Sequence, residues 1–255
     1  ALLQRSSEPL IRNMLRHAMR ILGKQFVMGR TIREALKRAE ELEAEGFRYS
    51  YDMLGEAAHT REDSTRYLQA YLDAIAAMGK AARGRGPQAA PGISIKLSAL
   101  HPRYEFAQAS QVLAELYPAL LQLGEAAKAV DIGLTIDAEE SERLELSLIL
   151  FERLALESRL QGWQGLGLAV QAYQKRAFDL IGWLEELATT SQRQLMVRLV
   201  KGAYWDSEIK RAQERGVVGY PVFTRKGNTD VSYLACAKRL LASPVRFFPQ
   251  FATHN

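Results

Sequence analysis

The chain of 255 residues contains a single cysteine, Cys236, and only four histidines. One cysteine excludes a disulfide within the chain and is typical of a protein of the reducing cytosol. Cys236 lies in the helical pattern of residues 234–238, so we expect a buried, inert thiol. No histidine has metal-ligand spacing to a carboxylate or to the cysteine, so the sequence predicts no metal site.

Long apolar runs are also missing. No segment approaches the roughly 18 consecutive apolar residues that cross a bilayer, and residues 1–7 lack the apolar core of a signal peptide. We therefore expect a soluble or peripheral protein. The net charge is +5, from 34 Lys and Arg against 29 Asp and Glu, and most cations alternate with acids along helices. This pattern argues against nucleic acid as a principal partner and favours small anionic ligands.

Apolar runs alternate with long helical patterns, which is typical of parallel βαβ units. Six strands are predicted, at residues 47–54, 93–97, 133–136, 166–170, 196–200 and 245–251. Helical patterns lie near residues 61–80, 107–129, 138–158, 173–190, 206–216 and 229–242. Two further helices are predicted in residues 8–45, the second beginning after Thr31, with Glu34 placed as in a capping box.

Two α/β architectures have this order of elements, a doubly wound sheet and a (βα)8 TIM-type barrel. No Gly-x-Gly-x-x-Gly turn follows any strand, which counts against the doubly wound nucleotide-binding sheet. We therefore predict an α/β TIM-type barrel, of which this chain covers strands one to six. Residues 1–45 are predicted to form a helical segment that leads into the barrel, at residues 46–255.

Polar residues stand where the apolar runs end, and ligands bind at the carboxyl ends of parallel strands. Four roles are open to Lys96: a Schiff-base nucleophile, a cation that binds an anionic ligand, a partner of a carboxylate, or a lysine at the sheet edge that reaches solvent. Asp137 can pair with Lys96, accept a proton or cap the next helix, and the local pattern favours the cap. Gln171 ends a buried strand, so its amide needs partners, and a ligand that both donates and accepts hydrogen bonds would supply them.

Cations and a glycine mark the end of the fifth strand. Arg198 lies within an apolar strand, where a guanidinium is costly to bury without a carboxylate or an anionic ligand nearby. Lys201, Gly202 and Ala203 precede a helix expected from Asp206 and offer a cation and backbone amides for a phosphate group.

Two later segments carry similar groups. Residues 224–230 present hydroxyls and two cations before a helix whose N-cap would be Thr229 or Asp230, and phosphate binding and plain capping both suit them. Thr253, His254 and Asn255 end the sixth strand, where a histidine serves either as a structural hydrogen bonder or as a ligand contact.

Together these segments resemble the proline dehydrogenase family, whose motifs they match in the same order along the chain. The matching segments are residues 94–104, 136–140, 171–175, 198–206, 224–226 and 251–255. The similarity is greatest to the proline dehydrogenase domain of the bifunctional bacterial proline utilization A enzymes, and it covers nearly the whole chain.

The resemblance implies a distorted (βα)8 barrel that binds FAD non-covalently and oxidises L-proline to Δ1-pyrroline-5-carboxylate, the first step of proline catabolism to glutamate. It further implies hydride transfer to flavin N5 and a membrane quinone as electron acceptor. Lys96, Asp137 and Arg198 match catalytic positions, and Lys96 also matches a substrate-binding position. The positions that match the flavin site are Asp137, Gln171, Arg198, Lys201, Gly202, Ala203, Tyr204, Trp205, Thr224, Lys226, Thr253, His254 and Asn255.

One element of the family pattern has no match, the arginine pair on the final barrel helix that binds the proline carboxylate. We therefore expect the chain to be part of a longer polypeptide with an attached pyrroline-5-carboxylate dehydrogenase domain, and a DNA-binding domain is a further candidate partner. Quinone use implies a cytoplasmic protein with a peripheral contact at the inner face of the cytoplasmic membrane.

Two other functions suit the same architecture. A Schiff-base aldolase would use Lys96 or Lys201 as its nucleophile. A non-catalytic barrel would bind a nucleotide or a protein partner without turnover.

Overall fold

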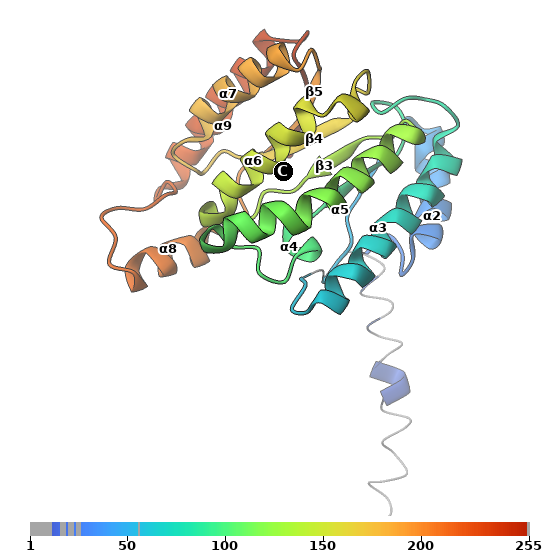
Figure 1. Cartoon of the computed structure of the whole chain (residues 1–255), viewed down its shortest axis with the longest axis horizontal. Helices are drawn as coiled ribbons and strands as arrows, with labels where there is room; N and C mark the ends of the chain where they lie inside the picture. Colours follow the sequence, from blue (N-terminus) through green and yellow to red (C-terminus); the bar gives the residue numbers. More distant parts are fainter. Residues whose placement is uncertain (1–11, 16–18, 20–22, 24–26, 56, 254–255) are drawn as a thin grey trace, which may run out of the picture. The chain divides into compact units, whose positions relative to one another are not determined.

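The computed structural model describes residues 12–15, 19, 23, 27–55 and 57–253 (Figure 1). It divides into two compact units, residues 1–49 and 50–255. In the first unit, helix α2 (Ile32–Ala44) begins after Thr31, whose hydroxyl accepts a hydrogen bond from the Glu34 N–H, as the sequence predicted. The helix expected before it falls largely outside the described residues.

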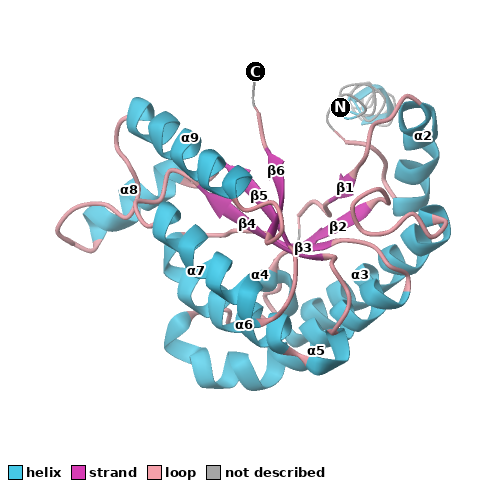
Figure 2. Ribbon diagram, turned by 90° about the horizontal axis from the view of Figure 1, so that it is seen from above, coloured by secondary structure: helices cyan, strands magenta, loops and turns pink. Residues whose placement is uncertain are grey.

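Six parallel strands form one sheet in the second unit, side by side in sequence order. They are β1 (Ser50–Tyr51), β2 (Gly92–Ile95), β3 (Leu134–Ile136), β4 (Leu166–Gln171), β5 (Leu195–Val200) and β6 (Phe247–Phe251). The sheet curls into a half-barrel, so the prediction of a TIM-type barrel covering six strands is confirmed (Figure 2).

Helices connect successive strands and cover the outer face of the curled sheet (Figure 2). The long ones are α3 (Arg61–Ala82), α5 (Ala109–Ala129), α6 (Leu144–Leu156), α7 (Ala177–Thr190) and α9 (Lys226–Ala242). Two shorter helices, α4 (Leu97–Leu100) and α8 (Trp205–Glu214), follow β2 and β5 closely at their carboxyl ends. No described helix is long and apolar enough to cross a membrane.

The alternation of side chains along β2 separates an apolar outer face from a polar inner one. In β2, Ile93 and Ile95 are fully buried, whereas the hydroxyl of Ser94 between them accepts a hydrogen bond from Arg198 of β5. Because β2 and β5 are separated by two strands, that bond crosses the inside of the curve. The polar side chains that form this bond therefore lie on the inner face of the curled sheet.

Several element boundaries differ from the sequence prediction. The first strand was expected over residues 47–54, but only Ser50 and Tyr51 pair with β2. Helix α9 begins at Lys226, three residues early, so the prediction that Thr229 or Asp230 caps it is wrong. The N–H groups of Asn228 and Thr229 already donate to the Arg225 carbonyl, so the helical turn starts before the residues with good capping side chains.

Cys236 is fully buried and makes no disulfide, as the sequence predicted. Burial raises the pKa of its thiol, which keeps the sulfur protonated and unreactive.

The amino end of β5 is held by a buried arginine. Arg193 is 5% exposed, and its guanidinium donates to the backbone carbonyls of Ala155, Leu160 and Trp163 over 2.7, 2.7 and 2.8 Å, with a longer bond of 3.4 Å to Glu157. Burial lowers the Arg193 pKa. These bonds fix the connection between α6 and β4 at the end of the half-barrel opposite the carboxyl ends.

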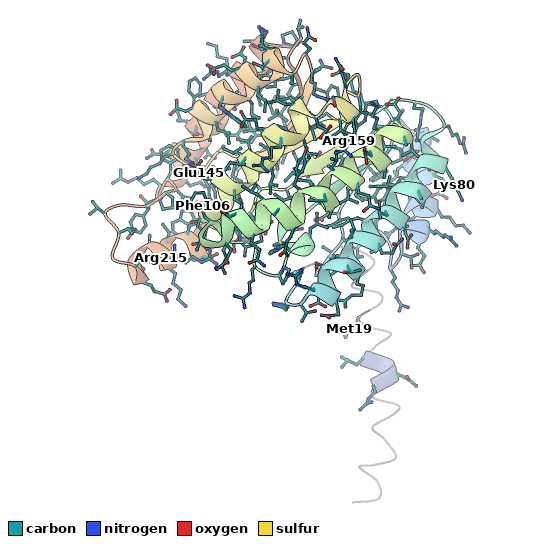
Figure 3. All side chains as sticks on the ribbon, viewed as in Figure 1. Met19, Lys80, Phe106, Glu145, Arg159 and Arg215 are labelled. Atoms are coloured by element: carbon teal, nitrogen blue, oxygen red, sulfur yellow. The ribbon has the colours of Figure 1, made fainter. Side chains whose placement is uncertain are left out.

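We expect Arg193→Met to lower the free energy of unfolding by about 3 kcal/mol, because it leaves several buried carbonyl oxygens without donors. Urea unfolding measures the change. Arg159→Met is the matched control, since Arg159 is 56% exposed on the surface (Figure 3), and this substitution should leave the stability nearly unchanged. Equal effects of the two substitutions would contradict a structural role for Arg193.

Candidate active site

The carboxyl ends of four neighbouring strands bring the predicted polar residues together at one edge of the sheet. Lys96 directly follows β2, Asp137 follows β3, and Gln171 is the last residue of β4. Arg198 lies in β5, and Lys201 directly follows that strand. The edge thus carries cations and carboxylates in the region where barrel enzymes place their chemistry.

Asp137 lies between two cations. Its Oδ1 is 3.2 Å from Arg198 Nη1, and its Oδ2 is 3.6 Å from Lys96 Nζ. The sequence pattern favoured Asp137 as a helix cap, and that prediction is wrong. The N–H of Ser141, which begins the next helical turn, donates to Glu208 of α8 instead. The carboxylate of Asp137 is therefore available for the cluster.

Arg198, whose side chain is 21% exposed, has three partners besides the strand backbone. Besides its contact with Asp137, Arg198 donates from Nη2 to the hydroxyls of Ser50 and Ser94, each over 2.8 Å. The two hydroxyls are 3.3 Å apart. The expectation of a carboxylate near Arg198 is thus met within the protein. The two serines were missed by the sequence reasoning, although Ser94 lies two residues before Lys96 and so on the same face of β2.

A second carboxylate, also missed, completes the cluster. Asp52 follows β1, and its Oδ1 and Oδ2 lie 3.2 and 3.4 Å from Lys96 Nζ. Lys96 therefore has one carboxylate on each side, Asp52 and Asp137. The available signal was weak, because a lone aspartate at the end of an alternating segment usually belongs to a turn.

The pKa of Asp137 is raised, chiefly because burial disfavours the charged carboxylate. The positive charges of Arg198 and Lys96 oppose this effect, whereas the negative charge of Asp52 adds to it. A carboxyl group with a raised pKa can accept and release a proton closer to neutral pH than an ordinary aspartate.

Gln171 is held in place by the loops around it. Its Nε2 donates to the Glu139 carbonyl over 2.8 Å, and its Oε1 accepts from the Ala203 N–H over 3.2 Å. The protein thus supplies the partners that the sequence suggested a ligand would supply. One N–H of the Gln171 amide is left for another acceptor.

The loop after β5 requires a glycine. Gly202 has a φ of 137°, and a Cβ there would lie 2.5 Å from the ring of Tyr173. The N–H groups of Ala203 and Tyr204 donate to Gln171 and to the Tyr173 hydroxyl. The Ala203 amide, one of the groups in the predicted phosphate cradle, is thus engaged within the protein.

Two lysines from different elements meet on one carboxylate. Asp230 accepts from Lys201 through Oδ1 and from Lys226 through Oδ2, each over 2.8 Å. These two hydrogen bonds lower the Asp230 pKa. Sequence reasoning named both lysines but considered Asp230 only as one of two candidate helix caps, because nothing in the chain order shows that α9 begins beside the end of β5.

The remaining predicted residues surround these groups at the same end of the half-barrel. Trp205 is 42% exposed, and its indole N–H donates to the Phe223 carbonyl over 2.9 Å. Thr224 is exposed just before α9, and Thr253 is exposed after β6. His254 and Asn255 lie outside the described residues. Within the described residues, no group of three or more His, Cys, Asp or Glu side chains is placed to hold a metal ion.

A family model described as proline dehydrogenase matches residues 35–255. The chain is 62% identical to the bifunctional protein PutA of Escherichia coli (strain K12) over 98% of its own length and 19% of that protein. It is also 27% identical to proline dehydrogenase 1 of Bacillus subtilis (strain 168), over 94% of the chain and 67% of that protein. The chain thus spans about a fifth of the length of the PutA relatives it matches.

Solved structures agree with this assignment. A crystal structure of a mutant of proline utilization A (PutA) from Bradyrhizobium japonicum superposes with a TM-score of 0.85 at 54% identity, over the whole chain and 26% of that protein. The PutA of Bdellovibrio bacteriovorus inactivated by N-propargylglycine superposes with a TM-score of 0.89 at 26% identity, over 96% of the chain and 27% of that protein.

We expect Arg198→Met to raise the Asp137 pKa further, because it removes the cation that lowers it. The pKa of Asp137 is higher in the folded protein than in the unfolded chain, where it is near 3.8. Such a group contributes stability that is fully present at a pH below the unfolded pKa and is lost as the pH rises through the folded pKa. The substitution should therefore destabilise the protein more at pH 7 than at pH 4. Each tenfold weakening of the acidity of Asp137 corresponds to a difference of about 1.4 kcal/mol.

Denaturant unfolding at the two pH values measures this difference. The control is Asp137→Asn, in which the effect of Arg198→Met should no longer depend on pH. Equal destabilisation at both pH values in the otherwise unaltered protein would show that Arg198 does not control the protonation of Asp137.

Proposed function

Because the chain belongs to the proline dehydrogenase family, we propose that it forms part of an FAD-dependent enzyme that oxidises L-proline to Δ1-pyrroline-5-carboxylate. The observation that supports this most is the cluster of Lys96, Asp137 and Arg198 at the carboxyl edge of the half-barrel. We further propose that residues 46–255 are the FAD-binding barrel and that residues 1–45 are a helical segment leading into it.

The charges of the site fit an anionic cofactor. Asp230 shows that Lys201 and Lys226 can hold one anionic group between them, as the pyrophosphate of FAD requires. Thr224, exposed beside them, adds a hydroxyl donor. Arg198 supplies a fixed positive charge in the interior of the half-barrel.

The other proposed contacts with FAD come from the same loops. The free N–H of Gln171 would bind a ring acceptor, and Tyr204 and Trp205 would pack against the ribityl or adenine portion. Gly202 and Ala203 would lie against the cofactor. Thr253, His254 and Asn255 complete the proposed set.

FAD, when bound, would supply N5 as the acceptor for the hydride that leaves C5 of proline, with a membrane quinone as the proposed final electron acceptor. The fixed positive charge of Arg198 stabilises negative charge as it develops beside it. Lys96 binds the substrate carboxylate. The proline nitrogen must lose its extra proton before the hydride can leave, and Asp137 Oδ2, 3.6 Å from Lys96 Nζ, is the proposed group that receives it.

Further partners follow from the relatives. The PutA proteins are named bifunctional, which supports the proposal that a pyrroline-5-carboxylate dehydrogenase domain accompanies this chain. A DNA-binding domain and a peripheral contact with the cytoplasmic side of the membrane, where the quinone is reached, are part of the same proposal.

The arrangement of the lysines argues against a Schiff-base aldolase, which needs a neutral lysine amine as its nucleophile. Lys96 is ion-paired with Asp52 and Asp137, and Lys201 with Asp230. Such pairs suit anion binding better.

The direct test is the visible absorption spectrum of the FAD-loaded protein before and after adding L-proline in the absence of oxygen. We expect the oxidised flavin band to bleach, because hydride transfer to FAD removes the conjugation that produces it. D-proline is the control and should leave the band unchanged. A band that persists with L-proline would contradict the proposed substrate, and failure to bind FAD would contradict the proposed cofactor.

We also expect Lys201→Ala and Lys226→Ala each to weaken FAD binding about tenfold, because each removes one charge-assisted contact with the pyrophosphate. Titration of the apoprotein with FAD, followed by flavin fluorescence, gives the Kd. Lys238→Ala is the matched control, since Lys238 is exposed on the same helix α9 and should leave the Kd unchanged. An unchanged Kd in both test variants would contradict the proposal that the pyrophosphate binds in this part of the site.

A further inference from the structure

A small cavity adjoins Asp137 beside the start of α6. Its lining residues include Asp137, Tyr104, Arg143 and Ser147. The space open to the centre of a water molecule measures about 10 Å³, which is close to the least that holds one water. The chemistry proposed above gives neither this cavity nor Tyr104 a role.

Two buried polar atoms beside the cavity have no hydrogen-bond partner in the part of the chain that the structure describes. They are the Tyr104 hydroxyl and Arg143 Nε. The two side chains lie against each other, with the guanidinium carbon 5.6 Å from the centre of the Tyr104 ring. Buried donors without acceptors are costly, so a single acceptor in the cavity that they share would stabilise both.

The Tyr104 hydroxyl needs an acceptor for its proton. Tyr104 is 3% exposed, and burial raises the pKa of its hydroxyl, which therefore stays protonated. Ser147 lies near enough to lower this pKa, but its hydroxyl does not meet Tyr104 in hydrogen-bonding geometry. Ser147 instead donates to the Leu144 carbonyl over 2.7 Å. The acceptor for the Tyr104 proton must therefore lie inside the cavity.

A water molecule supplies what these groups lack. Its oxygen can accept from Tyr104 and Arg143, which leaves its two hydrogens for acceptors on the cavity wall. Glu139 also lines the cavity, but its two carboxylate oxygens already accept from a backbone N–H and from Arg143. Asp137 Oδ2 is 3.6 Å from Lys96 Nζ, so it can accept a shorter bond from the water.

We propose that this cavity binds one water molecule, which accepts hydrogen bonds from Tyr104 and Arg143 and donates one to Asp137. Tyr104 is then a positioning residue, because it orients through the water the carboxylate that is to receive the substrate proton. A donor to Asp137 favours its charged form and so opposes the effect of burial on its pKa. The water site does not depend on the proposed function, whereas its part in proton transfer rests on it.

A crystal structure of the FAD-loaded holoprotein that shows ordered water tests the site directly. We expect one water within hydrogen-bonding distance, about 2.7–3.2 Å, of the Tyr104 hydroxyl, Arg143 Nε and an Asp137 carboxylate oxygen. A cavity without a water would overturn the inference. A water bonded to Glu139 instead of Asp137 would overturn it as well.

The pH dependence of kcat for L-proline tests the effect on Asp137. Tyr104→Phe removes one of the groups that hold the water, so the charged carboxylate is less favoured and the Asp137 pKa rises. The acid side of the kcat profile should then move to higher pH, with kcat lowered about threefold at pH 6 and little changed at pH 8. Tyr117→Phe is the matched control, because the Tyr117 hydroxyl bonds to Glu157 and neither residue lines the cavity.

The free energy of unfolding gives a second readout that needs no turnover. The folded pKa of Asp137 lies above its unfolded value, near 3.8, so a further rise removes stability mainly at pH 7 and hardly at pH 4. Tyr104→Phe should therefore destabilise the protein more at pH 7 than at pH 4. In the Asp137→Asn background this difference should disappear.

Equal destabilisation at both pH values, with kcat lowered equally across the pH range, would show that Tyr104 has a merely structural role and would overturn the inference. If L-proline does not bleach the flavin of the unaltered protein, the proposed function fails. The crystal structure and the unfolding measurements still decide whether the water binds Asp137, so the two failures are distinguishable.

Discussion

The pairing of the Arg198 guanidinium is the constraint on which the site depends. Its side chain is only 21% exposed, and a cation largely removed from water must be paired and hydrogen-bonded. Arg198 meets this need with Asp137 and with the hydroxyls of Ser50 and Ser94. One side chain of β5 is thereby joined to β1, β2 and the loop after β3. The curvature that makes the sheet a half-barrel is what brings these partners within reach, so the fold and the charge cluster stabilise each other.

Space for this long side chain comes from the strand beside it. Ala169 is the register partner of Arg198 in β4, and Gly167 lies two residues earlier on the same face. A Cβ at Gly167 would lie 2.7 Å from the Thr135 hydroxyl and 2.9 Å from the Met196 carbonyl. Small residues on the inner face of β4 therefore leave room for the guanidinium and let neighbouring strands approach. Charged side chains can then lie close together at the carboxyl ends of the strands, while buried Arg193 holds the opposite end of the half-barrel.

The site combines two charge arrangements with different tasks. Around Arg198 and Lys96 the charges are balanced by Asp137 and Asp52. At the end of β5 and the start of α9, two lysines share only Asp230, which suits a purely anionic group. The proposed substrate and an anionic dinucleotide would thus be directed to neighbouring places along one edge.

The sequence by itself determined the strand and helix order, the barrel class and the residues at the strand ends, including Lys96, Asp137 and Arg198. These depend on local alternation and on motifs that are continuous in the chain. The pairing of Lys96 with Asp137 was among the possibilities that the sequence offered, and the tertiary structure decided the other partners, because the β1 and β5 side chains that meet are far apart in sequence and touch only when the sheet curls. The signal for Asp52 as a partner of Lys96 was therefore weak in the local pattern, and the signal that Asp230 bridges two lysines instead of capping a helix was absent.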